Sequence, residues 1–217
     1  MGLRELARDV WVVDHPFRAG PLSIGTRTTV LRDGGAITLV SPGPLAEEDA
    51  AAIAALGAVR AVVAPNREHH LFLAAALARF SGAEAYAPAA VAAKKRLSVA
   101  GPPEAAATAS LHAIPIGGMP RLEETAFVHV PSRTLVLTDF CFNLRPPAPW
   151  ATRAFMQHFN GGFDRFGPTS ICRRMMKDPA AVRASVERIC AEDFDRVIVA
   201  HGSVLETGGR AAMAGVI

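Results

Sequence analysis

The sequence predicts an α/β fold in which two β-sheets lie face to face between outer layers of helices, a four-layer αββα sandwich. The chain has two strand-rich halves, each with helices of its own, which is the pattern of two sheets covered on their outer faces. With 217 residues, 50% of them hydrophobic, the chain is long enough for one substantial core. We therefore expect a single domain over residues 1–217.

The first half alternates between strands and helices. Asp33-Gly34-Gly35 marks a hairpin turn, because Asp-Gly tolerates the positive φ that such turns require. Gly57 is expected to cap the helix before it, and residues 17–25 are expected to form a loop because they hold glycine and proline. The expected elements are strands at 10–13, 27–32 and 36–40, a helix at 47–56, a strand at 59–64, a helix at 71–80, a strand at 84–87 and a helix at 88–97.

The second half starts with strands and closes with a helix, a strand and a helix. Asp178-Pro179 is a good helix start, since aspartate accepts hydrogen bonds from the first turn and proline fits the first helical position. Val182, Val186 and Ile189 follow at helical spacing, so this helix would lie on a sheet. The expected elements are a strand at 111–116, a hairpin of strands at 125–130 and 133–138, a helix from 178, a strand at 196–200 and a final helix.

Residues 140–176 stand apart from this pattern. The part from Phe140 to Phe166 holds several phenylalanines, Trp150, prolines and Gly161-Gly162, with poor periodicity. We interpret it as an insertion that either forms a wall of the functional site or is covered by a second copy of the chain, in a homo-oligomer. Ordinary core packing is the alternative interpretation.

Composition narrows the class of function. The net charge of +3 is modest, and the one basic cluster, residues 173–177, is typical of a solvated helix face rather than a nucleic-acid surface. The three cysteines form no C-x-x-C pair, which favours a reducing compartment. No segment approaches the roughly 18 to 20 apolar residues that span a bilayer, and the first residues lack a signal-type apolar run. We expect a cytoplasmic protein that acts on a small molecule, without nucleic-acid or membrane partners.

Residues 61–72 are the first candidate for the chemistry. A β-branched apolar run ends at Ala64-Pro65, a polar loop carries the adjacent pair His69-His70, and an apolar segment follows. Loops at the carboxyl ends of strands are where α/β folds place their sites. Polar side chains between two buried elements need hydrogen bonds or a metal ion to offset their burial.

Asp139 and His201 also follow apolar β runs. Histidine and aspartate at successive strand ends are ligand types that suit zinc, iron or manganese. Each residue alone would be read as structural, a buried histidine or a turn cap. Together with the His69-His70 loop, and in this order along the chain, they indicate a metal site.

The chain resembles the metallo-β-lactamase fold superfamily from Trp11 to the closing helix. The superfamily has a strand followed by T-H-x-H-x-D-H, and residues 64–70 align with it. Residues 135–139 resemble the strand that ends in the bridging aspartate, and residues 197–202 resemble the final P-G-H-G segment. The resemblance implies the αββα fold and metal-dependent hydrolysis.

Departures from the signature imply that only one of the two metal sites is kept. The first-site positions hold Pro65, Arg67, and Gly118 or Met119, none of them an ordinary ligand. The second-site positions keep a complete set for one divalent ion, zinc by preference, with iron or manganese as alternatives; this set is His69, His70, Asp139 and His201. A second register would instead align Asn66, Glu68 and His70 with the H-x-E-x-D pattern of an iron-binding branch.

The implied chemistry is hydrolysis. A divalent cation lowers the pKa of its bound water to about 7 and so supplies hydroxide near neutral pH. Asp139 and Arg67 are the expected catalytic groups, with Arg67 holding an anionic substrate in place of the missing metal. His15 is expected to be structural, with reach to the mouth of the site as the alternative. We expect His112, His129 and His158 to lie on the surface or in hairpins, and Glu123-Glu124 to form a solvated turn.

Two other functional classes stay open at this point. The chain would be a non-catalytic binding module if the degenerate motif no longer supports chemistry, and it would carry out iron-based redox chemistry if the ligand set holds iron. The resemblance does not extend to β-lactam hydrolysis, because nothing in the sequence indicates that substrate pocket or export.

Overall fold

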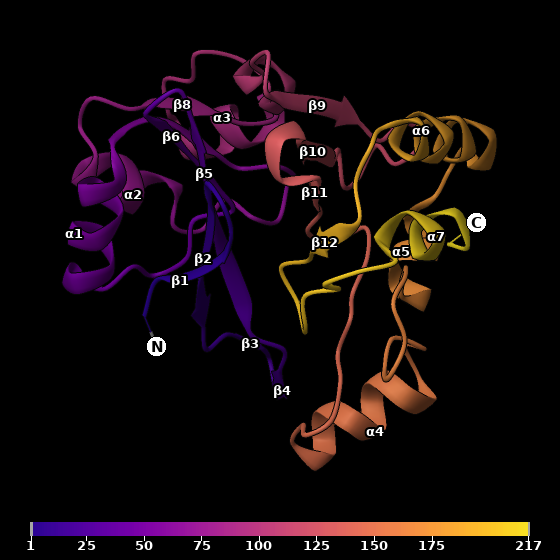
Figure 1. Ribbon diagram of the computed structural model, residues 1–217. Coiled ribbons are helices and arrows are strands. Elements are labelled where there is room, and N and C mark those ends of the chain that lie inside the picture. Colours follow the sequence, from indigo (N-terminus) through magenta and orange to yellow (C-terminus); the bar gives the residue numbers. More distant parts are fainter. Residues whose placement is uncertain (1, 217) are drawn as a thin grey trace.

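A computed structural model describes residues 2–216 and shows two β-sheets packed face to face between helices (Figure 1). The six-stranded sheet has the order β1 (Arg4–Ala7), β2 (Val10–His15), β5 (Thr26–Asp33), β6 (Ala36–Val40), β7 (Ala58–Val63) and β8 (Glu84–Tyr86). The four-stranded sheet has the order β12 (Arg196–Ile198), β11 (Thr134–Val136), β10 (Thr125–His129) and β9 (Leu111–Pro115). A separate hairpin joins β3 (Arg18–Ala19) and β4 (Leu22–Ser23).

Helices cover the outer face of each sheet. On the side of the six-stranded sheet lie α1 (Glu47–Leu56), α2 (Leu73–Arg79) and α3 (Ala89–Lys95), and beside the four-stranded sheet lie α5 (Ser170–Met175), α6 (Pro179–Ala191) and α7 (Gly209–Ala214). Helix α4 (Trp150–His158) projects at the lower edge of Figure 1, beyond both sheets. Two short 3-10 turns, η1 (Pro103–Ala106) and η2 (Val130–Ser132), flank β9 and β10. In residues 2–216 no helix has both the length and the apolar character to cross a membrane.

Strand β2 shows how the layers are bound together. Val10 and Val12 belong to the apolar cluster between the two sheets, whereas Trp11 and Val13 belong to the cluster under α1 and α2. Successive strand residues face opposite sides, so a wholly apolar strand is expected to be buried on both faces. A third cluster joins the four-stranded sheet to α6 and α7. Three apolar layers between four structural layers confirm the predicted αββα class.

The predicted elements are found with small shifts at their ends. Helix α1 has the predicted bounds, and it ends at Gly57, where a side chain would collide with the carbonyl oxygen of Gly35. The turn at Gly34 and Gly35 has the expected positive φ at both glycines. The prediction missed β1, the β3–β4 hairpin, which lies in the expected loop 17–25, and the helices α4 and α5.

Parallel strand pairs bring the candidate loops to one edge of the sandwich. Strand β7 runs parallel to β6 and β8, and β11 runs parallel to β12. The loops that leave the carboxyl ends of β7, β11 and β12 carry the side chains singled out in the sequence. Carboxyl ends of parallel strands are the usual place for ligand sites in α/β folds.

Candidate functional site

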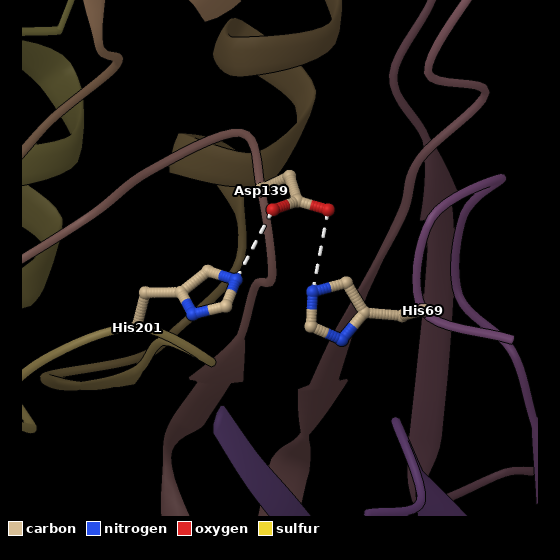
Figure 2. Close-up of side chains that lie close together, drawn as sticks. All are labelled: His69, Asp139 and His201. Carbon is tan, nitrogen blue, oxygen red and sulfur yellow. Dashed lines mark ion pairs between the residues drawn. The ribbon is translucent and has the colours of Figure 1, made fainter. Parts of the chain in front are cut away.

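Three side chains from three strand-end loops meet at one point: His69, Asp139 and His201 (Figure 2). The Asp139 carboxylate lies between the two rings, with Oδ2 at 3.3 Å from His69 Nε2 and Oδ1 at 3.3 Å from His201 Nε2. One ligand atom from each residue can be chosen so that all three lie within 4.8 Å of one another. Among residues 2–216 this is the group of histidine, cysteine and acidic side chains with the spacing of a metal site.

The far nitrogens of both rings are fixed by hydrogen bonds. His201 Nδ1 lies 2.6 Å from the carbonyl oxygen of Gly25, and His69 Nδ1 lies 2.6 Å from Ser41 Oγ. A carbonyl oxygen only accepts, so His201 Nδ1 carries a hydrogen and donates it. In a neutral His201 the Nε2 atom therefore presents a lone pair towards Asp139. The hydroxyl of Ser41 can donate or accept, so His69 is not restricted in this way.

A lone pair that faces a carboxylate calls for a cation between them, either a proton or a metal ion. The donor set fits a divalent metal, because imidazole nitrogen and carboxylate oxygen are ordinary zinc ligands. Two such donors on one tetrahedral zinc, each about 2.0–2.1 Å from the ion, lie roughly 3.3 Å apart. Each of the two nitrogen–oxygen distances is 3.3 Å, from His69 to Oδ2 and from His201 to Oδ1, so each pair separately has this spacing. Hydrogen bonds on the outer ring nitrogens are the usual support of metal-binding histidines.

The charges at this point are strongly coupled. Burial alone would raise the pKa of Asp139, but the neighbouring His69 and His201 hold it well below its usual range. Burial alone would lower the pKa of His69, but the Asp139 carboxylate outweighs burial and raises it. The group therefore favours an ionised Asp139 carboxylate beside His69.

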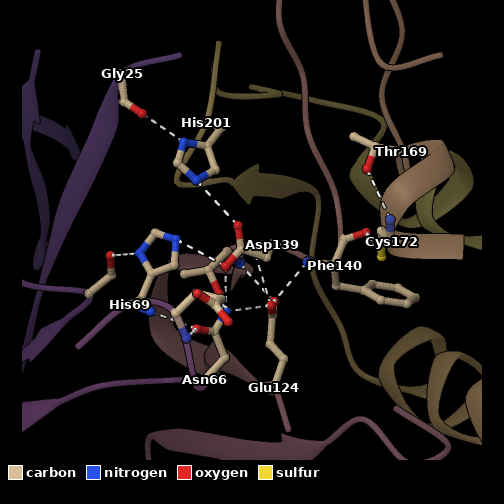
Figure 3. Close-up of polar contacts among 12 residues, drawn as sticks. Gly25, Asn66, His69, Glu124, Asp139, Phe140, Thr169, Cys172 and His201 are labelled. Atoms are coloured by element: carbon tan, nitrogen blue, oxygen red, sulfur yellow. Dashed lines mark hydrogen bonds and ion pairs between the residues drawn. The ribbon is translucent and has the colours of Figure 1, made fainter. Parts of the chain in front are cut away.

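Glu124 supports the Asp139 loop from below (Figure 3). Its buried carboxylate accepts hydrogen bonds from three successive backbone N–H groups, those of Thr138, Asp139 and Phe140, at 2.8–3.0 Å. Burial and the nearby charge of Asp139 raise the pKa of Glu124, while the hydrogen bonds from Thr138 and Asn66 oppose the rise. Three N–H groups aimed at one carboxylate fix the turn that presents Asp139.

Asn66 joins the His69 loop to the Asp139 loop. Its side-chain oxygen accepts hydrogen bonds from the backbone N–H groups of Glu68 and His69, both at 2.8 Å. Its amide nitrogen lies 2.8 Å from Asp139 Oδ2 and 3.0 Å from Glu124 Oε2. The amide is fully buried, so this side chain sets the separation of the two loops.

His201 is held from the opposite sheet. The Gly25 carbonyl that accepts from His201 precedes β5, and Arg27 on β5 donates from Nη1 to the carbonyl oxygen of Val199 at 2.6 Å. Arg27 is buried and pairs with Asp14 at 2.6 Å, which balances its charge. The six-stranded sheet therefore positions a side chain that the four-stranded sheet carries.

His70 and Glu68 are placed differently from their neighbour His69. His70 Nδ1 lies 3.1 Å from the carbonyl oxygen of Glu68, and its ring is outside the group of three. Burial lowers the pKa of His70, and the ammonium groups of Lys95 and Lys94 lower it further. Glu68 and His70 both line the cavity above the group. The structure thus brings together three of the four predicted ligands, and their binding of a metal ion stays a prediction.

Arg67 points away from the group of three. Its Nη1 lies 3.1 Å from the carbonyl oxygen of Pro120 and 3.7 Å from Glu123. At Gly118, another first-site position, a side chain would collide with the carbonyl oxygen of Asp178. No side chain there could hold an ion without displacing that carbonyl, which agrees with the predicted loss of the first site.

His15 is buried under the Ser41–Pro44 segment, where its Nε2 lies 2.8 Å from Thr28 Oγ1 and its ring fills the space beside Gly43. It lies outside the group of three. Glu124, in contrast, was expected in a solvated turn and is only 1% exposed. The sequence shows only two adjacent glutamates before the apolar strand β10, and nothing there indicates which of them is buried.

Two cavities open from the group. An outer cavity of about 440 Å³ is lined by His69, Asp139 and His201 together with side chains of α3, including Lys94 and Lys95. An inner cavity of about 380 Å³ is lined by Asp139 and by residues 142–175 of the insertion. Ser23 and Thr152 share two hydrogen bonds, which tie the β3–β4 hairpin to α4 over the inner cavity. Residues 142–175 of the insertion therefore line the cavity that Asp139 also lines.

Solved structures resemble this arrangement over nearly the whole chain. The metallo-β-lactamase DIM-1, from a crystal exposed to ceftazidime, is 12% identical, with a TM-score of 0.67 over 100% of this chain and 96% of that one. The metallo-β-lactamase FIM-1 from Pseudomonas aeruginosa, in its mono-zinc form, is 13% identical, with a TM-score of 0.61 over 98% and 92%. The chain has the metallo-β-lactamase fold.

The metallo-β-lactamase fold is shared more widely than any one activity. A metal-soaked flavodiiron core from Synechocystis is 11% identical, with a TM-score of 0.63 over 97% of this chain and 58% of that one. No protein-family model matches the sequence, and no curated protein does. At such identities the likeness confirms the predicted fold, and function has to be argued from the site.

Proposed function

We propose that this protein is a metal-dependent hydrolase of a small molecule, with one divalent ion held by His69, Asp139 and His201. The observation that carries the proposal is the pair of 3.3 Å distances between Asp139 and the Nε2 atoms of His69 and His201. The Gly25 carbonyl makes the His201 nitrogen a lone-pair donor at that point. Three protein ligands and one open position are the usual form of a catalytic zinc site.

Zinc is the preferred ion because the donor atoms are two imidazole nitrogens and a carboxylate oxygen, and FIM-1, a structure with the same fold, has a mono-zinc form. When bound, the ion would supply Lewis acidity, which makes water nucleophilic near neutral pH. Ser41 and Gly25 keep the two rings in orientation, and Glu124 and Asn66 keep the carboxylate in place. The outer cavity above the group gives the substrate access to it.

Metal analysis of protein purified without a histidine tag tests the proposal. We expect about one zinc ion per chain for a site of this kind, and loss of the ion in His201→Ala. His70→Ala is the matched control, because His70 is the adjacent histidine of the loop and lies outside the group; it should keep its metal. Turnover of ester and phosphoester substrates should disappear with the metal and return when zinc is restored. A protein that binds no zinc, iron or manganese would contradict the proposal.

A non-catalytic binding module is the second candidate. The specific observation in its favour is the remodelling of the first-site positions, where Arg67 is bound to the Pro120 carbonyl and Gly118 has no room for a side chain. This candidate predicts ligand binding in the outer cavity without turnover, whether or not zinc is present.

A further inference from the structure

We propose that the site takes an amphipathic anion, with an apolar chain in the inner cavity and a carboxylate or phosphate head beside Lys94 and Lys95 in the outer one. This inference names the class of ligand and rests on the proposed function only for the reaction that the ligand would undergo. It rests on the two cavities, on their meeting point at Asp139, and on the charges that face them.

The outer cavity has a positively charged rim. Lys94 and Lys95 at the end of α3 both line it, and both side chains are exposed. Within residues 2–216 neither lysine takes part in an ion pair, whereas Glu68 is the one carboxylate of the rim besides Asp139. The two ammonium groups lie next to each other at the end of α3, so this part of the rim is positively charged. Such a rim attracts an anion and holds it through charge-assisted hydrogen bonds.

The inner cavity is apolar. Phe142, Phe155, Met156 and Met175 form its walls, with Leu122 and Cys172 among its other lining residues. Away from its junction with the outer cavity, where Glu68 and Asp139 lie, its polar side chains are occupied by internal hydrogen bonds. Asn160 bonds to Met156 and Ile171, and Thr169 bonds to Cys172. Cys172 is a poor nucleophile here, because burial raises the pKa of its thiol to about 12. The cavity therefore offers dispersion contacts and little hydrogen bonding, which suits an alkyl or aryl group.

The two cavities meet at the candidate metal site. Both are lined by Ala19, Ile24, Glu68 and Asp139, so one molecule can extend from one into the other. The ring of Phe142 lies 4.6 Å from the ring of His201, centre to centre, so the apolar wall begins at the site itself. A ligand with its tail under α4 and its head at α3 would place its middle beside His69, Asp139 and His201.

Binding of octanoate and octyl phosphate, measured by titration calorimetry on chelator-treated protein, tests the inference. Both compounds join an alkyl chain of about seven or eight carbons to an anionic head, and removing the metal prevents direct ligation of the head. Acetate lacks the chain and octanol lacks the charge, so both should bind at least about tenfold more weakly, which corresponds to 1.4 kcal/mol. Tighter binding of octyl phosphate would assign a phosphate-type head, and tighter binding of octanoate a carboxylate-type head; either supports the proposal.

Two variants separate the ends of the ligand. The double variant K94A/K95A should raise the dissociation constant of octanoate about fivefold or more at low salt, and much less at high salt. Lys177→Ala is its control, because Lys177 is exposed and lines neither cavity. Ala19→Trp should block the passage at an exposed hairpin position and weaken binding tenfold or more, whereas Ala51→Trp on exposed α1 should leave it unchanged.

The inference would be overturned if octanol and octanoate bound equally well. It would also be overturned if neither K94A/K95A nor A19W changed the dissociation constant of octanoate. The result is independent of the hydrolase proposal, since binding is measured without metal and without turnover. A protein that binds octanoate but no zinc would refute the hydrolase alone. A protein that binds zinc but no amphipathic anion would refute this inference alone.

Discussion

The edge of the sandwich that carries the strand-end loops has two corners, and their side chains are arranged in opposite ways. At one corner His69, Asp139 and His201 converge, and each is held by a buried partner: Ser41, the Glu124 carboxylate through the backbone, and the Gly25 carbonyl. At the other corner, where the resemblance places the first metal site, Arg67 binds a backbone carbonyl and Gly118 packs against the start of α6. Both corners are parts of the same fold, and they differ in what their side chains are bonded to.

The difference teaches that a metal-site geometry depends on its supporting contacts as much as on its ligands. The corner of His69, Asp139 and His201 keeps a network that aims two ring nitrogens and a carboxylate at one point. At the other corner the positions of the expected ligands hold Arg67, which binds a backbone carbonyl, and Gly118, which packs against backbone. Substitutions of the supporting residues should therefore change stability strongly at the corner of His69, Asp139 and His201, and little at the corner of Arg67 and Gly118.

Glu124→Ala should have the largest effect. It leaves the backbone N–H groups of Thr138, Asp139 and Phe140 without their acceptor, and each unsatisfied buried group costs about 1–3 kcal/mol. We expect the free energy of unfolding, from urea denaturation, to fall by about 3 kcal/mol or more. Glu123→Ala is the control, since Glu123 is its sequence neighbour and lies at the surface beside Arg67; it should change stability little. Equal effects of the two substitutions would break the comparison.

His129 provides a baseline for pH effects away from both corners. It is buried, bonded to Ser132 and to the carbonyl oxygen of Arg32, and burial lowers its pKa. The unfolded chain therefore binds a proton more readily than the native chain, so stability falls as the pH drops below about 6.5, the ordinary pKa of histidine. When the pH is lowered from about 7.5 to 5.5, the free energy of unfolding, from urea denaturation, should fall less in His129→Gln than in the native sequence. A steeper loss in the variant would contradict the burial argument.

Arg67→Ala should have the smallest effect. The guanidinium is partly exposed and its ion pair with Glu123 spans 3.7 Å, so the free energy of unfolding should change by no more than about 0.5 kcal/mol. Binding of octyl phosphate should stay within about twofold, a change worth less than 0.5 kcal/mol. A large rise in the Michaelis constant for an anionic substrate would return Arg67 to the catalytic role that the sequence predicts.

The fold could be predicted from the sequence because its strands are apolar on both faces and its turns are marked by glycine. Strand β2 and the Gly34–Gly35 turn are examples. The β3–β4 hairpin and α4 were missed. The hairpin strands are only two residues long, and the hairpin and α4 are joined by the Ser23–Thr152 contacts. Such long-range contacts leave no local signal in the residues that make them.

The site could be predicted in part for the same reason. His69, Asp139 and His201 each follow an apolar strand, so topology alone brings them to one edge. Whether His69 or His70 faces the group depends on Asn66, whose side chain holds the backbone of residue 69. Glu124 acts through the backbone of a segment fourteen to sixteen residues away. Neither effect can be read from residue type or spacing.

The bond between His201 and the Gly25 carbonyl joins positions 176 residues apart in the chain. On the ribosome, the amino-terminal sheet can form while the residue that completes the group has yet to be synthesised. The group is therefore complete only after residue 201 has been added to the chain. A product truncated before that residue would carry His69 and Asp139 without the second histidine.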